Sequence, residues 1–358
     1  MKIRLSLLLA ALVILFGCGG GGSSNSDSHP TYLTIPQANH VAGYRIDNSS
    51  GKLSTMSGSP FATGASPLAV SVAPSKNFVY AADSVDNDIV AYSADSSKGS
   101  LTEISPRTPA GISPAALVND PSGSFLFVAN QGSSDVSVFS IATGGKLTEV
   151  AGSPFRVGSG PSAMAVSPSG SFLYVSNSNS LSISAFAITA GTGFLTPVVG
   201  SPFLIGDAPS GLTIDPAEKF LYVTLPQKNG FTGFTIDPTT GALTSITTVP
   251  FVAGTDPISI AVTNTYIYVA NLGSNNVSVY TFDATTGQAT QLTDSPFTAG
   301  TGPASVAVDP SGTFVYVVNQ RSKNISAFKV NSSNGNLNAV EGSPFSTGNA
   351  AASMVIPK

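Results

Sequence analysis

Residues 303–319 read PASVAVDPSGTFVYVVN. Two runs in this stretch, Ser305–Val308 and Phe314–Val318, are rich in the β-branched and aromatic residues that favour strands. Between them, the sequence DPSG at 309–312 is typical of a tight turn, with proline and glycine in favoured positions. The second run is almost continuously apolar, as expected of a strand that is buried on both faces. The stretch therefore predicts two antiparallel strands joined by a turn.

Two more strands follow in the same unit. After a polar loop at 320–323, the segment Ile325–Val330 alternates apolar and polar residues, as in a strand with one buried face. The dipeptide Asn334-Gly335 is a strong hairpin signal, and Leu337–Val340 is a weaker fourth strand. The unit is therefore predicted to be a small antiparallel sheet of four strands.

This unit recurs along the chain with a period near 47 residues. From Gly64 to Gly348 there are 284 residues in six steps. A glycine followed three residues later by proline occurs at Gly64, Gly111, Gly158, Gly206, Gly254 and Gly300, and Gly348 is a seventh with Ala351 in the proline place. Most copies are preceded by Ser-Pro-Phe, and the second copy departs from this with Thr108-Pro109-Ala110. An aromatic residue of the second strand recurs at the same spacing, at Tyr32, Tyr80, Phe127, Tyr174, Tyr222, Tyr268 and Tyr316.

Seven such units indicate an all-β fold, a seven-bladed β-propeller in which each four-stranded sheet, or blade, buries its faces against its neighbours. The first unit begins at Tyr32, in second-strand position, and the last unit supplies Ala352–Ile356 after its own fourth strand. We therefore expect the C-terminal strand to complete the N-terminal blade and to close the ring. This assigns residues 31–358 to a single domain, which we expect to be monomeric.

The motifs of the repeat match a known type of propeller. The runs YVSN at 174–177, YVAN at 268–271 and YVVN at 316–319 are similar to the Tyr-Val-Thr-Asn repeat, whereas the lack of tryptophan argues against Trp-Asp repeat propellers. With its Pro-Ser-Gly turn and Thr-Gly hairpin, the unit resembles the lactonase-type propellers, typified by bacterial 6-phosphogluconolactonase and the fungal muconate-lactonizing enzymes. The resemblance covers Thr31–Lys358. It implies lactone hydrolysis by His, Glu and Arg around the channel, but no matching set of these residues is visible in the sequence.

The first thirty residues are typical of an exported lipoprotein. After a short basic start, the twelve-residue apolar run Leu5–Phe16 is too short to span a bilayer as a permanent helix, but it fits a secretory signal. The run ends just before Cys18, the single cysteine, in a sequence that resembles a bacterial lipoprotein cleavage box. We predict a signal peptide at 1–17, acylation of Cys18 and a flexible Gly/Ser tether at 18–30.

These features also predict a location. Several acyl chains on Cys18 would hold the protein stably to a membrane. The expected location is the cell envelope, on the outer membrane or facing the periplasm. The alternative is an ordinary secretory signal with an incidental cysteine, which would give a secreted protein.

The composition narrows the classes of function. There are 15 Lys and Arg and 19 Asp and Glu among 358 residues, which gives a net charge of −4. This balance argues against a nucleic-acid groove, because such a groove needs a clustered basic face. One cysteine excludes a disulfide framework. We expect no cofactor, because no phosphate-cradling glycine motif lies between a strand and a helix.

Functional residues of propellers usually lie at the mouth of the axial channel, where the loops between second and third strands meet the loops between blades. Polar residues recur there after the second strand, and because they recur we interpret them as turn caps. They are Asn130, Asn177, Asn271 and Asn319, with Asp83 in the same place and Leu225 as an exception.

Residues that break the repeat are better candidates for chemistry. Lactone hydrolysis needs a base that activates water and a donor that stabilises the oxyanion. Asp207 and Asp256 are the carboxylate candidates, since they lie just before first strands where sibling units carry Ser or Gly. Arg156 or Arg321 would polarise the substrate, and His40, at the start of a third strand, is another candidate base. Other basic residues of this face are Arg107, Lys228 and Lys323.

One loop carries three carboxylates, Asp83, Asp86 and Asp88. Hard cations such as Ca²⁺ bind several oxygen ligands, so this loop is a candidate calcium site. The spacing does not match the Asp-x-Asp-x-Asp-Gly pattern of an EF-hand. For these carboxylates, as for the charges above, a solvated loop position is the alternative.

Two functions remain open from the sequence. The first is a binding or interaction module of the cell envelope, whose mouth takes an unidentified protein, glycan or small molecule. The second is a lactone hydrolase acting on an uncharged lactone, since export and sparse basic residues fit a phosphorylated sugar lactone poorly. The hydrolase predicts a mouth pocket in which an acid–base residue lies close to a cation.

Overall fold

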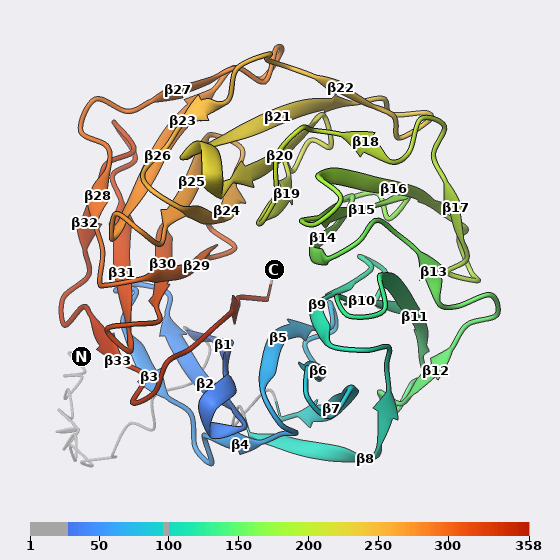
Figure 1. The fold of residues 1–358 in the computed structure, drawn as a ribbon. Helices are drawn as coiled ribbons and strands as arrows, with labels where there is room; N and C mark the ends of the chain where they lie inside the picture. Colours follow the sequence, from blue (N-terminus) through green and yellow to red (C-terminus); the bar gives the residue numbers. More distant parts are fainter. Residues whose placement is uncertain (1–27, 96–99, 358) are drawn as a thin grey trace, which may run out of the picture.

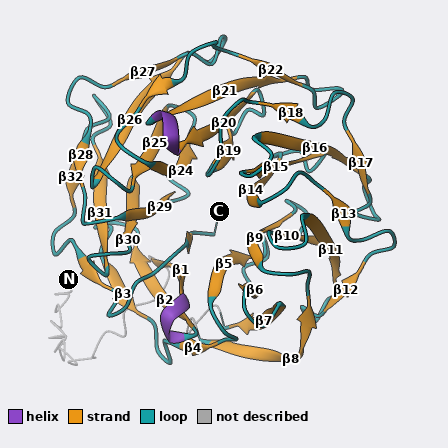
Figure 2. Ribbon diagram, viewed as in Figure 1, coloured by secondary structure: helices purple, strands orange, loops and turns teal. Residues whose placement is uncertain are grey.

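Seven antiparallel sheets surround a central axis in the computed structural model, which describes residues 28–95 and 100–357 (Figure 1). Strands provide nearly all of the regular structure, and Figure 2 shows two short 3-10 turns, η2 (Pro36–Ala38) and η3 (Pro226–Lys228). The chain is therefore a seven-bladed β-propeller, as the repeat predicted.

The three inner strands of each blade follow one another outward from the axis. The first strands are β34 (Met354–Val355), β5 (Pro67–Val72), β9 (Pro114–Asn119), β14 (Pro161–Val166), β19 (Leu212–Ile214), β24 (Pro257–Val262) and β29 (Pro303–Val308). The second strands are β1 (Ser28–Ile35), β6 (Phe78–Asp83), β10 (Phe125–Asn130), β15 (Phe172–Asn177), β20 (Phe220–Leu225), β25 (Tyr266–Asn271) and β30 (Phe314–Asn319). The third strands are β2 (His40–Asp47), β7 (Asp88–Ala94), β11 (Asp135–Ile141), β16 (Ser182–Ile188), β21 (Gly230–Ile236), β26 (Asn276–Phe282) and β31 (Asn324–Val330).

The outer edge differs from the single fourth strand that the sequence predicted. In six blades it is split into two short segments that pair with opposite ends of the third strand. These pairs are β3 (Leu53–Thr55) and β4 (Phe61–Ala62), β12 (Leu147–Glu149) and β13 (Phe155–Arg156), β17 (Leu195–Pro197) and β18 (Phe203–Leu204), β22 (Leu243–Ser245) and β23 (Phe251–Val252), β27 (Ala289–Gln291) and β28 (Phe297–Thr298), and β32 (Leu337–Ala339) and β33 (Phe345–Ser346). The Ser-Pro-Phe motif forms the link and begins the second segment, so the phenylalanine belongs to the sheet.

The serine of the motif has a defined partner. Ser343 Oγ accepts the amide N–H of Ala327 in the third strand at 2.9 Å, and Ser295 Oγ accepts that of Val279 at 2.8 Å. In the second blade the outer strand β8 (Leu101–Pro109) is continuous. Its Ser105-Pro106 peptide is cis, like the Ser-Pro peptides of five other blades. Thr108 and Pro109 pair with Ile89 and Asp88, as Phe61 and Ala62 pair with Val41 and His40 in the first blade. The Ser-Pro pair of this blade is therefore at 105–106, and Arg107 is an additional residue before Thr108.

The ring closes as the sequence predicted. Strand β34 pairs with β1, with Val355 opposite Tyr32 and Met354 opposite Leu33. Thr31 Oγ1 also donates a hydrogen bond to the carbonyl of Val355 at 2.8 Å. Strand β1 begins at Ser28, so residues 28–30 pair with β2 and are not part of the tether to which the sequence analysis assigned them. The predicted signal peptide and Cys18 lie outside the described residues.

The hydrophobic core lies between blades, where each pair of neighbours shares one cluster. Leu33 of the first blade, for example, packs in one cluster with Tyr316 and Ile325 of the seventh. A recurring interblade clasp lies beside these clusters: an aromatic residue and a tyrosine of one second strand contact the hairpin glycine of the next blade. Four tyrosine hydroxyls donate to glycine carbonyls in this way, in the pairs Tyr80–Gly145, Tyr174–Gly241, Tyr222–Gly287 and Tyr316–Gly51.

Gly51 closes the clasp between the last and the first blade. Its φ is +73°, and a Cβ there would overlap the ring of Phe314. We expect Gly51→Ala to lower the free energy of unfolding by about 2–5 kcal/mol, because it adds a steric clash to the cost of a left-handed alanine. Gly191 has a φ of +80° with nothing within 4 Å, so Gly191→Ala is the matched control and should lose only about 1 kcal/mol. Urea unfolding measures both, and equal losses would show that the clasp does not stabilise the ring.

Candidate functional site

The recurring asparagines at the mouth bond to neighbouring backbone and side chains, as expected of turn caps. Asn271 Oδ1 accepts the N–H of Gly254 at 3.1 Å. Its Nδ2 donates to Asn276 Oδ1 at 2.8 Å and to Ser278 Oγ at 2.9 Å. Asn130 makes the same set of contacts in the third blade, with Gly111, Asp135 and Ser137. Each asparagine therefore joins the loop that enters a blade to the third strand of the same blade.

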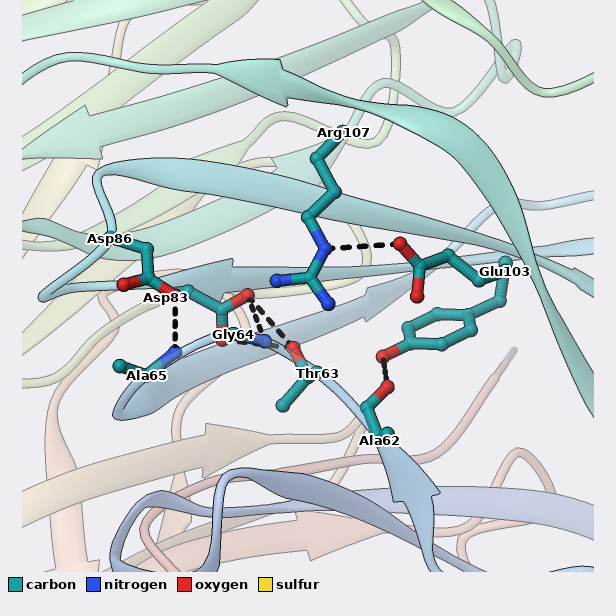
Figure 3. A network of polar contacts seen from close by, with 9 residues as sticks. Ala62, Thr63, Gly64, Ala65, Asp83, Asp86, Glu103 and Arg107 are labelled. Atoms are coloured by element: carbon teal, nitrogen blue, oxygen red, sulfur yellow. Dashed lines mark hydrogen bonds and ion pairs between the residues drawn. The ribbon is translucent and has the colours of Figure 1, made fainter.

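The second blade carries Asp83 where the third and sixth blades carry asparagine (Figure 3). The carboxylate of Asp83 is fully buried and accepts hydrogen bonds from the Thr63 hydroxyl at 2.8 Å and the Gly64 N–H at 2.8 Å. Asp88 lies opposite Asp83 in the strand pairing, at the position of Asn276 and Asp135, and its Oδ1 is buried without a donor among the described residues. In the sibling blades the asparagine Nδ2 supplies this donor.

A proton on one of the two carboxyl groups would supply the missing hydrogen. Burial is the main cause that raises the pKa of Asp83 to about 7, opposed by the bonds from Thr63 and Gly64. Burial also raises the pKa of Asp88, against the opposing charge of Arg107. Both carboxyl groups therefore hold a proton more tightly than free carboxyl groups do, and a proton between them near neutral pH would replace the asparagine N–H.

The structure does not support a calcium site in this loop. Asp83 faces Thr63 and Gly64, and Asp86 Oδ2 accepts the N–H of Ala65 at 2.7 Å, so both carboxylates hold the entering loop in place (Figure 3). Within residues 28–95 and 100–357, no three His, Cys, Asp or Glu side chains are grouped so that they could hold a metal ion. Arg107, beside this loop, donates from Nε to Glu103 Oε1 at 3.0 Å.

A pocket of about 430 Å³ lies over the fifth blade, beside β18 of the fourth. Its walls come from the loop before β19, the end of β20, strand β21 and the link between β22 and β23. The lining residues are Leu204, Ile205, Gly206, Asp207, Leu225, Lys228, Thr232, Phe234, Ser245, Thr247, Thr248 and Pro250. Both hydroxyl-bearing and apolar side chains therefore face the same space.

The fifth blade loses two signature groups of the repeat at this place. Leu225 stands at the position of the mouth asparagine, which the first blade also lacks because it carries Ile35 there, and Val249-Pro250 replaces Ser-Pro. Phe234 stands where the first, second and sixth blades carry a tyrosine whose hydroxyl bonds to a carbonyl of an outer segment, and where the third, fourth and seventh blades also carry phenylalanine. Among the seven repeats, only the fifth lacks both the asparagine and the serine, and both positions lie at this pocket or next to a residue that lines it.

Asp207 and Lys228 form the charged part of this pocket. Asp207 is 8% exposed, and its Oδ1 accepts the N–H of Ala208 at 2.8 Å. Its Oδ2 lies 3.7 Å from Nζ of Lys228, which η3 presents to the pocket. An acidic residue therefore lies close to a cation at the mouth, and this is the arrangement that the hydrolase hypothesis predicts.

The other predicted site residues lie apart from this pair. Asp256 has a left-handed backbone with φ +56°, and its N–H donates to Asn229 Oδ1 at 3.2 Å. Arg156 and Arg321 are exposed, in β13 and in the loop after β30, and neither lines the pocket. His40 begins β2 as expected, and its Nδ1 lies 3.1 Å from the carbonyl oxygen of Ala38. The cation that accompanies Asp207 is therefore Lys228, and neither of the two arginines.

The sequence analysis placed Lys228 on this face without pairing it, and it missed Thr232, Ser245 and Thr247 altogether. One signal in the sequence could have identified the pocket: the fifth unit alone loses both the asparagine, at Leu225, and the serine of Ser-Pro, at Val249. A site that occurs in only one copy of a repeat can be found by comparing the copies position by position.

The fold is that of a propeller, and a pocket with a carboxylate–ammonium pair lies over its fifth blade. The family model described as "Lactonase, 7-bladed beta-propeller" matches residues 25–160, 150–258 and 252–352. The chain belongs to this lactonase propeller family. No curated protein sequence matches it.

Solved structures share the fold at low sequence identity. A putative 6-phosphogluconolactonase from Bacteroides fragilis is similar with a TM-score of 0.82 and 18% identity, over 94% of this chain and 99% of that one. The periplasmic gluconolactonase of Pseudomonas aeruginosa is similar with a TM-score of 0.77 and 18% identity, over 92% and 98%. Among the residues described, no helix has the length and apolar character needed to cross a membrane.

The proton shared by Asp83 and Asp88 should make stability depend on pH. Because the pKa of Asp83 is raised from 3.8 to about 7 by folding, the folded chain binds this proton more tightly than the unfolded chain. The stabilisation is therefore present below pH 4 and is lost as the pH rises to about 7. We expect Asp83→Asn to supply a permanent donor and to raise the unfolding free energy at pH 8 by about 1–3 kcal/mol.

The measurement is urea unfolding of wild type and variant from pH 4 to 8. The difference between the two free energies should grow over this range, while Asp256→Asn, a surface control, should leave a constant offset. Parallel curves for wild type and Asp83→Asn would contradict a shared proton.

Proposed function

We propose that this protein is an exported propeller that binds a small, neutral, hydroxylated ligand in the pocket over the fifth blade. The observation that supports it most is the convergence of the blade's departures from the repeat on one pocket containing Asp207 and Lys228. A site that exists once in a sevenfold structure requires such local departures. Pockets of about 300–1,000 Å³ with a few polar groups among apolar walls are typical of small-molecule sites.

The charges of the pocket favour a neutral ligand. Of its lining residues, all within the described part of the chain, only Asp207 and Lys228 are charged, and they lie within 3.7 Å of each other. Their charges largely cancel, so a phosphate group would find no unpaired cation. The hydroxyls of Thr232, Ser245 and Thr247 would instead bond to ligand hydroxyl or carbonyl groups.

Lactone hydrolysis is the second candidate, favoured by the family and by the carboxylate–ammonium pair. Asp207 would accept a proton from water, and the hydroxide would add to the lactone carbonyl while Lys228 stabilises the oxyanion. Collapse of the tetrahedral intermediate would break the ring C–O bond, and Asp207 would return its proton to the leaving oxygen, giving the hydroxy acid. A protein described as a periplasmic gluconolactonase shares the fold.

We also propose that the protein is attached to a membrane of the cell envelope through an acylated Cys18. The support is the apolar run Leu5–Phe16 directly before the single cysteine and the Gly/Ser-rich segment after it. The alternative is a secreted protein with the same domain.

Removing either charge of the pair should weaken the site. With δ-gluconolactone and other neutral lactones as probes, we expect Asp207→Asn and Lys228→Met to raise the dissociation constant at least tenfold in calorimetry, because each leaves its partner unpaired. Asp256→Asn should bind as wild type does. Binding that is indifferent to both pocket variants would exclude this pocket as the site.

The wild type and its pocket variants also distinguish a binding module from a hydrolase. A binding module should show no acid release above the uncatalysed rate when the lactones are followed by pH-stat titration. A hydrolase should show turnover that Asp207→Asn lowers by roughly 10²-fold or more.

The anchor has its own test in a bacterial host that expresses the full chain. We expect the wild type to incorporate labelled palmitate and to sediment with membranes, and Cys18→Ser to lose the label and appear in the soluble fraction. A wild-type protein that is unlabelled and soluble would favour simple secretion.

A further inference from the structure

Exposed aliphatic side chains border the pocket over the fifth blade. Leu204, which lines the pocket, is 80% exposed, while Val249 is 69% and Val252 is 75% exposed. Val249 lies between the lining residues Thr248 and Pro250, and Val252, which does not line the pocket, follows three residues later in β23. The other exposed large apolar residues, in the part of the chain that the structure describes, range from 38% exposed at Leu181 to 91% at Val199, and they include Val85, Ile112 and Phe194.

The repeat provides an internal comparison for these residues. Leu204 and Val252 pair with the first residues of their third strands, Ser182 and Gly230. The equivalent position of the other blades is occupied by Ala62, Pro109, Arg156, Thr298 and Ser346. An exposed aliphatic chain is therefore not needed to build this part of a blade.

Val249 is unusual in the same way. It replaces the serine of Ser-Pro, whose hydroxyl accepts a third-strand N–H in five sibling blades, at Ser59, Ser153, Ser201, Ser295 and Ser343. Three positions that are small, polar or hydrogen-bonded in most other blades thus carry exposed aliphatic chains on the fourth and fifth blades, and Leu204 and Val249 are the two that lie at the pocket. Exposed apolar surface that the fold does not require marks an interaction site.

We propose that the ligand is a neutral amphiphile, with a polar ring in the pocket and one aliphatic chain lying over Leu204, Val249 and Val252. This inference rests on the proposed function of the pocket and adds the ligand class. A small molecule fits better than a protein partner, because Leu204 lines, and Val249 adjoins, a cavity that contains a balanced charge pair. The polar head would contact Asp207 and Lys228, while the chain would remove aliphatic surface from water.

A homologous series of neutral lactones with one ring and alkyl chains of two to ten carbons tests this inference. Binding is measured by calorimetry below the critical micelle concentration of each compound. For the wild type we expect affinity to rise by up to about fourfold per methylene group until the chain passes the rim. The double variant Leu204→Thr/Val252→Thr, which introduces the residue of the sixth blade, should flatten this dependence and leave the chain-free ring unaffected.

The controls separate the ring site from the chain site. Asp207→Asn should weaken every member of the series by the same factor, and Val85→Thr, at an exposed valine of the second blade, should change nothing. If lactones of every chain length bind with the same affinity, an amphiphilic ligand is excluded, while the proposed function of the pocket is retained. If no member binds, both proposals fail. A dimer in light scattering that Leu204→Thr/Val252→Thr dissociates would instead assign the patch to contact between two copies.

Discussion

The contact between an aromatic strand and the hairpin glycine of the next blade determines how the ring is built. Phe314 and Tyr316 enclose Gly51 across the junction of the last and first blades, and the same pair of contacts links most neighbours around the ring. Each blade buries little within itself, so its stability comes from these shared surfaces. A ring of this kind gains its last interface only on closure, which is why the C-terminal strand pairs beside the N-terminal one.

The fold was predictable where a pattern is long or repeated. The alternation and turn signals of 303–340 predicted the inner strands. The lack of a first strand before Tyr32 predicted that the C-terminal strand closes the ring. The split outer edge was not predicted, because segments as short as Phe345–Ser346 are too brief to show any period. The start of β1 at Ser28 was missed for a related reason, since its polar residues resemble the tether and only their pairing with β2 identifies them as strand.

The candidate site was predictable in part. Asp207 was found because it breaks the repeat, yet its partner Lys228 lies 21 positions later and is brought near only by the turn η3. The loss of a side chain is harder to recognise in a sequence than a gain: Leu225 and Val249 stand beside the pocket at positions where most other blades carry hydrogen-bonding groups. At Asp83 the sequence shows a carboxyl group in place of an asparagine, and only its burial, beside the unpartnered oxygen of Asp88, indicates that it holds a proton more tightly than usual.

The direction of strand β1 has a consequence for how the molecule is oriented. Ser28 pairs with Asp47 at the far end of the blade, whereas Ile35 pairs with His40 at the mouth. The backbone before Ser28 therefore joins the ring on its back, the side opposite to Asp207 and Lys228. The pocket therefore opens on the face of the ring that β1 reaches at Ile35, and the start of β1 does not obstruct access to it.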